Sequence, residues 1–507
     1  MEVVMKENPS STRHRQFKMR GQPSKSIWYN LTLILLRKMS KRKAIEISKA
    51  AEIPQNDPVS TAALTAKKCP YLSTVNRKVL DFDFERRCCV TLNYNHVYVC
   101  MVCGKFFQGR SKQSPAYTHA VEAGHCVFMN LETARVYCLP DGYEVKDTTL
   151  SDIQHALHPT FQEEDILNIP KSNTLCRDVH GKLYLPGYIG LNNLKRTDYI
   201  NVIVQALVRV KPIRSFFLRG KEASYKKCDN PTVNSFGNLV RRIYNNRRLK
   251  NAVDPHEFVQ CVSTESKKRF DIGSPKYAID FCSWLLSVLD RKIYKKCSKN
   301  TVIRDTFQGQ VAVKIRNKET NEVISTTTSP FFHLSLDLPK QETLLVEGKQ
   351  GRHTQVSIQS LLLKYNASGN DGGQLRAQTI SMKDGAVRLK SYHIISSPKY
   401  LILNVKRFSR NSFFVEKNNT LVQFPLKNLR FHGKTYDLIA NIIHTIPDGI
   451  KNGEDDSGGH NIGYYKAHVQ HEGEKKQWYE IEDLRVIDIM PQLVSLAEAS
   501  ILIYKET

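Results

Sequence analysis

The stretch GLNNLKRTDYINVIVQAL, residues 190–207, joins a tight turn to the start of an apolar segment. Glycine and asparagine favour a turn at its beginning, because both tolerate backbone conformations that other residues avoid. The following YINVIVQAL is apolar along much of its length and predicts a buried helix. Thr197 and Asp198 precede it and are predicted to cap the helix, since their side-chain oxygens can accept free N–H groups of the first turn.

The pattern on the C-terminal side of this stretch predicts a large α+β domain from residue 184 to residue 507. Helical periodicity comes first, and strand-like alternation follows from about residue 330 onward. The helical pieces are INVIVQALVRV, FGNLVRRIYNN and AIDFCSWLLSVLDRKIY, and the strand pieces are FFHLSLDLP, YLILNVKRF, YDLIANIIH, YYKAHVQH and WYEIED. Helices followed by strands predict segregated helical and antiparallel-sheet layers.

Three further segments are predicted on the N-terminal side. Residues 1–68 hold 14 Lys and Arg against 5 Asp and Glu and predict a basic, mostly disordered arm, in which KRK at 41–43 is a weak nuclear import signal. Either Met1 or Met39 can serve as the initiating residue. Residues 69–145 form a block rich in cysteine and histidine, and residues 146–183 read as a connector with two short amphipathic helices.

The composition favours an acidic partner. The net charge is +26 and the pI is near 9.5, so the chain is strongly basic. Its hydrophobic fraction of 41% is typical of a folded protein. Such a charge favours RNA, or assemblies built around RNA, but does not separate RNA binding from docking on an RNA-bound protein. The longest early apolar run, IWYNLTLILL, is too short to cross a bilayer, and no signal peptide is found.

The block of residues 69–145 predicts a metal site. Seven of the 12 cysteines lie here, and without a secretory signal they predict metal chemistry in a reducing compartment. Cys100 and Cys103 have the C-x2-C spacing that brings two thiolates to one ion, and His119 and His125 complete a tetrahedral set. The alternative is a group of core cysteines and surface histidines without metal.

The same block resembles the ubiquitin-protease type zinc finger found beside deubiquitinase catalytic domains. The resemblance covers CPYL, CCV, YVCMVCGKFFQGR, YTHAVEAGHCVFMNL and VYCLPDGYEV. It departs from the family where further zinc ligands are common: Cys88 and Cys89 are adjacent, and Gln108 and Pro115 stand at other ligand positions. The resemblance therefore implies about one structural zinc, and the departures argue against capture of a ubiquitin carboxyl terminus.

Residues of about 186–505 resemble the ubiquitin-specific protease family. The matching pieces are GLNNLKRTDYINVIVQAL, FFHLSLDLP, PKYLILNVKRF, VQFPL, YDLIANIIH, GYYKAHVQH and WYEIED. The resemblance implies a papain-like fold with a helical thumb and an antiparallel palm and fingers. It places Asp198 at the position of the nucleophilic cysteine, Tyr464 at the base histidine, Asp483 at the orienting acid and Asn193 at the oxyanion-hole asparagine.

These replacements predict an inactive site with no catalytic residue. A carboxylate at residue 198 is a much weaker nucleophile than a thiolate, and the hydroxyl of Tyr464 is a poor base at pH 7. An aspartic dyad of Asp198 and Asp483 is not expected, because the family geometry puts Tyr464 between them. Lys195 and Arg196 replace a small Gly-Asn pair and add charge to the cleft, and the presumed fingers lack the second cysteine pair that holds a zinc ion.

Three histidines were considered as substitutes for the lost base. His460 lies in a Gly/Asp/Ser-rich loop and would have to fold back toward the site. His444 and His468 fall within strand patterns, and we expect each to be a hydrogen-bonded core residue.

The combination resembles the inactive members of the family that act as splicing factors associated with the tri-snRNP. This implies a nuclear scaffold that binds spliceosomal snRNP proteins, with contact to snRNA through basic surfaces as a further expectation. A non-catalytic ubiquitin-binding adaptor is the alternative, and an isopeptidase with a rewired site is a third hypothesis. The sequence does not determine which snRNP components are contacted.

Overall fold

The computed structural model describes residues 69–220, 230–297, 301–318, 320, 322–339, 355–365, 378–381, 387–410, 415–446 and 463–507. The predicted arm of residues 1–68 and the loop histidine His460 lie outside these ranges. None of the helices in the described ranges is both long and apolar enough to cross a membrane.

The Cys/His-rich block forms a small sheet with one helix, α2 (Pro115–Ala123). Its strands lie in the order β2-β1-β3-β4-β5, and they are β2 (Phe106–Gln108), β1 (Val97–Cys100), β3 (Val127–Asn130), β4 (Val136–Cys138) and β5 (Glu144–Val145). Ser114 caps α2 by accepting the N–H of Tyr117, and Gly124 ends the helix in the left-handed conformation.

The two amphipathic patterns of the connector form helices, as predicted. They are α3 (Ser151–Leu157) and α4 (Glu163–Asn168). Each buries its apolar side, with Ile153 and Leu157 on α3 and Ile166 on α4.

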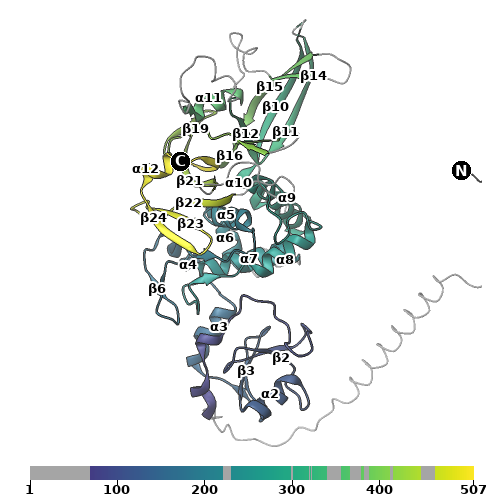
Figure 1. Ribbon diagram of the computed structural model, residues 1–507, viewed down its shortest axis with the longest axis vertical. Coiled ribbons are helices and arrows are strands. Elements are labelled where there is room, and N and C mark those ends of the chain that lie inside the picture. The colour runs from purple at the N-terminus through teal and green to yellow at the C-terminus, as the bar shows by residue number, and fades with distance from the viewer. Residues whose placement is uncertain are drawn as a thin grey trace, which may run out of the picture. The chain divides into compact units, whose positions relative to one another are not determined.

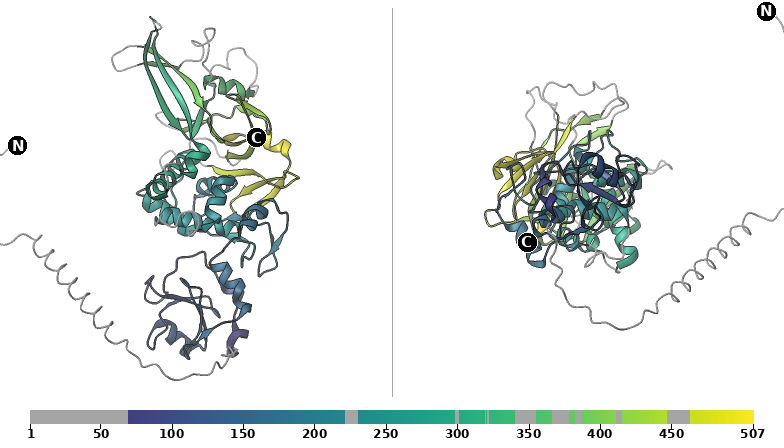
Figure 2. Two further views of the ribbon diagram at one scale, coloured as in Figure 1. Left: turned by 180° about the vertical axis from the view of Figure 1, so that it is seen from behind. Right: turned by 90° about the horizontal axis from the view of Figure 1, so that it is seen from below.

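Six helices form the first half of the large domain (Figure 1). They are α5 (Asp198–Leu207), α6 (Lys211–Leu218), α7 (Pro231–Tyr244), α8 (His256–Glu265), α9 (Ala278–Cys297) and α10 (Val302–Phe307). Figure 1 shows α7, α8 and α9 close together, and the left view of Figure 2 shows the same group of teal helices from behind. Every residue of α5 is buried, so this helix is the centre of the helical layer.

The second half is built on one large sheet, and α5 packs against its strands β21 and β22. The strand order is β12-β16-β25-β21-β22-β23-β24, and β20 pairs with β21. The strands are β12 (His333–Asp337), β16 (Tyr400–Lys406), β20 (Leu429–Phe431), β21 (Lys434–Thr445), β22 (Tyr464–Gln470), β23 (Trp478–Glu482), β24 (Arg485–Ile489) and β25 (Ala499–Glu506). The α+β prediction is confirmed, with one difference: β12 pairs with β16 in the parallel direction.

A second sheet of four strands has the order β11-β10-β15-β14. These strands are β10 (Gly309–Asn317), β11 (Val323–Phe331), β14 (Gln378–Ser381) and β15 (Val387–Ser396). The remaining elements are the pairs β6 (Cys176–Arg177) with β7 (Leu183–Tyr184), β8 (Gly190–Leu191) with β9 (Ala252–Val253), β13 (Gln355–Ser357) with β19 (Leu421–Gln423) and β17 (Phe408–Arg410) with β18 (Val415–Lys417), and the helices α11 (Ile358–Leu362) and α12 (Pro491–Ser495).

The turn before α5 is held against the end of β23. The N–H of Leu191 donates to the carbonyl of Asp483 over 2.9 Å. A Cβ on Gly190 would lie 2.5 Å from the Cα of Leu484, so only glycine allows this approach of the two backbones. The sequence of the turn therefore fixes where α5 starts relative to the sheet.

Candidate functional site

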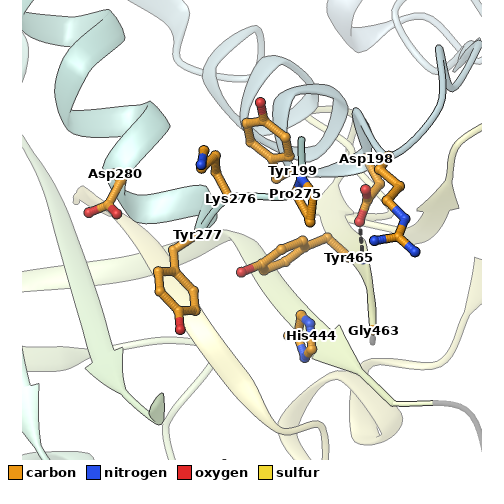
Figure 3. Close-up of a pocket in the computed structure, with 10 residues that line it drawn as sticks. Asp198, Tyr199, Pro275, Lys276, Tyr277, Asp280, His444, Gly463 and Tyr465 are labelled. Atoms are coloured by element: carbon orange, nitrogen blue, oxygen red, sulfur yellow. Dashed lines mark hydrogen bonds between the residues drawn. The ribbon is translucent and has the colours of Figure 1, made fainter. Parts of the chain in front are cut away.

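Asp198 connects α5 to the sheet and also interacts with N–H groups in the first turn of its own helix. It is the first residue of α5, and its Oδ2 accepts the backbone N–H of Tyr465 on β22 over 2.8 Å (Figure 3). Thr197 stands at the N-cap position, but its side chain makes no capping hydrogen bond there; its hydroxyl accepts the N–H of Leu194. The capping prediction for Thr197 is wrong, because this hydroxyl is used to close the preceding turn.

The environment of Asp198 disfavours its charge. Burial raises the pKa of this carboxyl above its ordinary value, and the charge of Asp483 raises it further. The N–H groups of Tyr465, Asp198 and Tyr199 act in the opposite direction and hold the ionised form. The carboxylate of Asp198 therefore accepts a backbone hydrogen bond that holds α5 against the sheet.

Asn193 and Asp483 are engaged with each other. Asn193 Nδ2 donates to Asp483 Oδ2 over 2.9 Å, and Asn193 Oδ1 accepts the N–H of Thr197. The second carboxylate oxygen of Asp483 accepts from Asn201 Nδ2 over 3.0 Å. The amide of Asn193 is therefore used to hold the turn. Asn201, which the sequence analysis missed, completes this arrangement from one turn along α5.

Tyr464 makes no hydrogen bond to Asp198 or Asp483 among the described contacts. It is the first residue of β22, so its side chain and that of its neighbour Tyr465 leave opposite faces of the strand. Lys466, which shares the face of Tyr464, lies with its Nζ 5.3 Å from the centre of that ring. The position predicted for the lost base thus holds a tyrosine beside a cation.

A cavity of about 290 Å³ lies next to Asp198. Its lining comes from the turn before α5, from the start of α5, from the segment before α9 and from β21 and β22 (Figure 3). The lining residues are Arg196, Asp198, Tyr199, Pro275, Lys276, Tyr277, Asp280, His444, Gly463 and Tyr465. The cleft beside the degenerate position has therefore not been filled.

His444 lies in this cavity and is a second residue that the sequence analysis misjudged. It is buried, and within the described part of the chain its Nδ1 has no hydrogen-bond partner. Burial and the nearby charge of Lys417 lower the pKa of His444 to about 3, so the ring is neutral at pH 7. A Cβ on Gly463 would lie 2.1 Å from this ring, which explains the glycine there. The Nε2 of His468 pairs with Glu480 over 3.0 Å, as expected of a core histidine, while its Nδ1, like that of His444, has no hydrogen-bond partner among the described residues.

The finger brings Cys100, Cys103, His119 and His125 together. Their ligand atoms all lie within 4.8 Å of one another. The distances are 3.4 Å from Cys103 Sγ to His119 Nε2, 3.6 Å from Cys100 Sγ to His125 Nδ1, and 3.1 Å between the two histidine nitrogens. A tetrahedral zinc ion with Zn–S of about 2.3 Å and Zn–N of about 2.0 Å separates its ligands by roughly 3.3–3.8 Å. The four residues therefore fit zinc.

The other cysteines of the block are not part of this group. Cys69, Cys126 and Cys138 are buried in the apolar core of the finger as free thiols. Cys88 is also buried and its sulfur accepts the N–H groups of Val90 and Thr91. The prediction that the whole cysteine cluster is metal chemistry is therefore wrong for these residues.

Changing Asp198 to cysteine is expected to produce no ubiquitin hydrolysis. A thiol there lacks a base, because Tyr464 is a tyrosine and His444 is neutral with a pKa near 3, far below that of a thiol. The test is release of fluorophore from a ubiquitin amide by Asp198→Cys, with Asp198→Ser as the matched control. Faster release by the cysteine variant than by the serine variant would contradict this account of the site.

The stability of the protein is expected to depend on the ionisation of Asp198. Because the folded pKa is raised, the protonated form is favoured by folding; this contribution is complete below the ordinary value of 3.8 and is lost as the pH rises through the folded pKa. Asp198→Asn keeps an acceptor for Tyr465 and does not titrate. The unfolding free energy of the wild type minus that of Asp198→Asn, measured in urea titrations, should therefore fall as the pH is raised above the ordinary value of 3.8. A difference that is constant or rises with pH would show that burial does not dominate.

Comparison with known proteins agrees with this architecture. The family profile described as ubiquitin carboxyl-terminal hydrolase matches residues 189–504, and that described as a Zn-finger in ubiquitin-hydrolases and other protein matches residues 87–150. The chain is 39% identical to the mouse protein named Ubiquitin carboxyl-terminal hydrolase 39, over 89% of this chain and 82% of that protein. It is 32% identical to the Schizosaccharomyces pombe protein named Probable mRNA-splicing protein ubp10, over 92% of this chain and 95% of that protein.

A solved structure supports the fold independently. The crystal structure of an essential yeast splicing factor superposes with a TM-score of 0.70, at 24% sequence identity, and the match covers 86% of this chain and 99% of that chain. The resemblances of the finger and of the large domain are both confirmed. The chain belongs to the ubiquitin carboxyl-terminal hydrolase family.

Proposed function

We propose that this protein is a non-catalytic splicing factor that acts as a scaffold in the assembly or stability of the U4/U6.U5 tri-snRNP. The observation that carries the proposal is the use of Asp198, at the position of the family nucleophile, as an acceptor for the N–H of Tyr465. The name of the Schizosaccharomyces pombe relative, which matches nearly the whole chain, supports a role in splicing.

The loss of hydrolysis follows from the chemistry of the replaced positions. An attack by the carboxylate of Asp198 would form an anhydride, which is a high-energy product, and would break its hydrogen bond to Tyr465. Asn193, the expected oxyanion donor, already donates to Asp483. At residues 198 and 193, both in the described part of the chain, neither a thiol nucleophile nor a free amide donor is available, so the domain is proposed to serve as a framework.

The finger is proposed to hold one structural zinc ion through Cys100, Cys103, His119 and His125. Two thiolates and two imidazoles form a closed tetrahedral set, which is typical of zinc that stabilises a fold. Near Cys88, the side chain of Gln108 accepts the hydroxyl of Thr91 over 2.8 Å. These hydrogen bonds occupy the region in which relatives carry additional ligands, and they support a single ion.

The partners are proposed to be snRNP proteins of the nucleus. A net charge of +26 suits a particle rich in RNA. Purification of a tagged full chain from nuclear extract should recover U4, U5 and U6 snRNAs above a tag-only control. Recovery of none of them would refute the splicing assignment.

A ubiquitin-binding adaptor is distinguished by direct binding. Calorimetry of the purified chain with mono-ubiquitin should show no heat of binding if the protein is a scaffold. Measurable binding together with no recovered snRNA would favour the adaptor.

A further inference from the structure

Two basic loops contribute to the wall of the cavity beside Asp198, and we call their six cations the cationic rim. They come from the turn before α5 and from the loop between α8 and α9, and they are Lys195, Arg196, Lys267, Lys268, Arg269 and Lys276. The two loops are joined by a hydrogen bond from the N–H of Gly273 to the carbonyl of Lys195 over 2.8 Å. Arg196 and Lys276 line the cavity itself. The two loops of the rim therefore meet beside the cavity, and each contributes one cation to its wall.

The rim is both exposed and uncompensated. All its members except Lys276, which is half-buried, are exposed to solvent. Across the ranges that the structure describes, none of the six forms an ion pair with a carboxylate, although many other lysines and arginines of the domain do. Unpaired cations concentrated at the mouth of a cleft attract an anionic ligand.

The backbone of the rim is strained where its charges lie. Lys195 and Arg196 have φ of 67° and 56°, and Lys267 and Lys268 have φ of 54° and 62°. Left-handed backbone is unfavourable for residues with long side chains, and such strain gathers at functional sites. The N–H of Lys268 donates to the carbonyl of Ser263 over 2.7 Å and holds one of these conformations.

The interior of the cavity selects against a simple acidic ligand. Asp198 and Asp280 both line it, so a carboxylate that entered would meet two acidic groups. Its other walls include the rings of Tyr199, Tyr277 and Tyr465, and the unpartnered Nδ1 of His444 is buried there. A neutral aromatic group with polar edges suits this interior, whereas anionic groups suit the rim.

A single-stranded nucleic acid has both features, since its phosphates are anionic and its unstacked bases are neutral and aromatic. We propose that the cationic rim binds the phosphates of a single-stranded RNA segment while one of its bases enters the tyrosine-lined cavity beside Asp198. The choice of RNA rests on the proposed function, which places the chain in a particle that contains RNA. The degenerate cleft would then have exchanged one extended ligand for another.

Fluorescence anisotropy with the full chain tests the role of the rim. The probes are fluorescein-labelled 12-nucleotide oligomers of A, of C and of U. The variant Lys267→Glu/Lys268→Glu/Arg269→Glu should weaken binding at least about tenfold and make its salt dependence shallower, because each lost phosphate contact removes about 0.7 from the slope.

The matched control is Lys399→Glu/Lys427→Glu/Arg430→Glu, which reverses the charge of three exposed residues outside the cationic rim. Arg430 lies on β20, which pairs with the Lys434 end of β21, whereas His444 lies near the opposite end of that strand. The change in net charge is the same, and affinity should fall by less than about threefold. Equal losses in both variants, or no loss in either, would overturn the proposal, because binding would then come from overall charge or from the N-terminal arm.

A second variant tests the entry of a base. Tyr277 is exposed at the cavity and its ring packs on Phe408 with centroids 4.9 Å apart. Tyr277→Ala should lose about tenfold in affinity, as expected for one stacked base, and Tyr277→Phe should retain wild-type binding. Equal binding by both variants would show that no base stacks there and would overturn the proposal.

Polyglutamate serves as the alternative ligand. If it competes with RNA as well as unlabelled RNA does, the rim recognises acidic protein and the proposal is wrong. If the purified chain does not bind RNA, the RNA-binding proposal is wrong. The splicing assignment would still stand if snRNAs are recovered from nuclear extract, because protein partners can carry them. The two proposals can therefore fail separately.

Discussion

Replacing Cys100 and Cys103 together by serine is expected to remove the zinc ion and unfold the finger. Structural zinc sites contribute about 10–16 kcal/mol of apparent binding free energy at pH 7, which exceeds the total stability of most small domains. The metal residues also lie within the finger core, since the ring of His119 stacks on Phe107 with centroids 4.2 Å apart. Loss of the ion would therefore release both the α2 helix and the sheet beneath it.

Elemental analysis and limited proteolysis measure this effect. The wild type should hold about one zinc per chain, and the double variant should hold almost none and be cleaved within residues 87–150. The matched control is Cys88→Ser/Cys89→Ser, in the same finger but outside the four-residue group, which should keep its zinc. Loss of zinc from the control, or retention in the first variant, would show that the ligands have been misassigned.

The second large effect is expected at an ion pair between α6 and the segment after β22, in which the arginine is buried but the side chain of Glu472 is 28% exposed. Arg214 on α6 is only 2% exposed, and its two terminal nitrogens donate to Glu472 over 2.7 and 2.9 Å. Glu472→Ala removes the two hydrogen bonds that this buried guanidinium donates to a carboxylate, and such a loss costs about 1.5–3 kcal/mol. The free energy of unfolding in urea should fall by that amount.

A pair of the same kind on the surface provides the control. Arg219, which follows α6, donates two hydrogen bonds to Glu163 over 2.8 and 3.1 Å, but both side chains are well exposed. Glu163→Ala should cost no more than about 1 kcal/mol, because water replaces the lost partner. Equal costs for the two variants would mean that burial does not set the strength of these pairs.

Much of the fold was predictable from the sequence because each element has a local signal. The apolar period of α7 and α9 and the alternation in β16, β21 and β22 identify helices and strands without knowledge of the tertiary structure. The parallel pairing of β12 with β16 was not predictable, since it depends on a crossover of more than sixty residues between them.

The sequence identified which residues stand at the catalytic positions of the family, but not which hydrogen bonds these residues make. The partner of Asp198 is Tyr465, which is 267 residues away in the chain, so the sequence favoured the local alternative of a helix cap. The same limitation applies to Asn201, whose only local signal is a polar residue in an apolar helix. A buried thiol such as Cys138 and a proposed zinc ligand such as Cys103 are the same residue type. They can be told apart only from the three-dimensional structure, in which Cys138 lies in the apolar core and Cys103 lies in the four-residue Cys/His group.

The cavity was missed because the resemblance directs attention to residues 193, 198, 464 and 483. His444 lies on β21 and Tyr277 lies just before α9, and neither corresponds to a position in the degenerate catalytic set. What brings them together is the packing of α5 and α9 against the large sheet, which a local pattern does not report.

The residues at the positions of the family's active site are expected to support structure and binding but no hydrolysis. This is tested most directly by incubating purified wild-type protein in excess over a fluorogenic ubiquitin amide, with Asp198→Ala prepared in parallel to reveal contaminating hydrolases. Both proteins should release fluorophore at the rate of buffer alone. Release by the wild type above that rate, abolished in Asp198→Ala, would contradict this expectation.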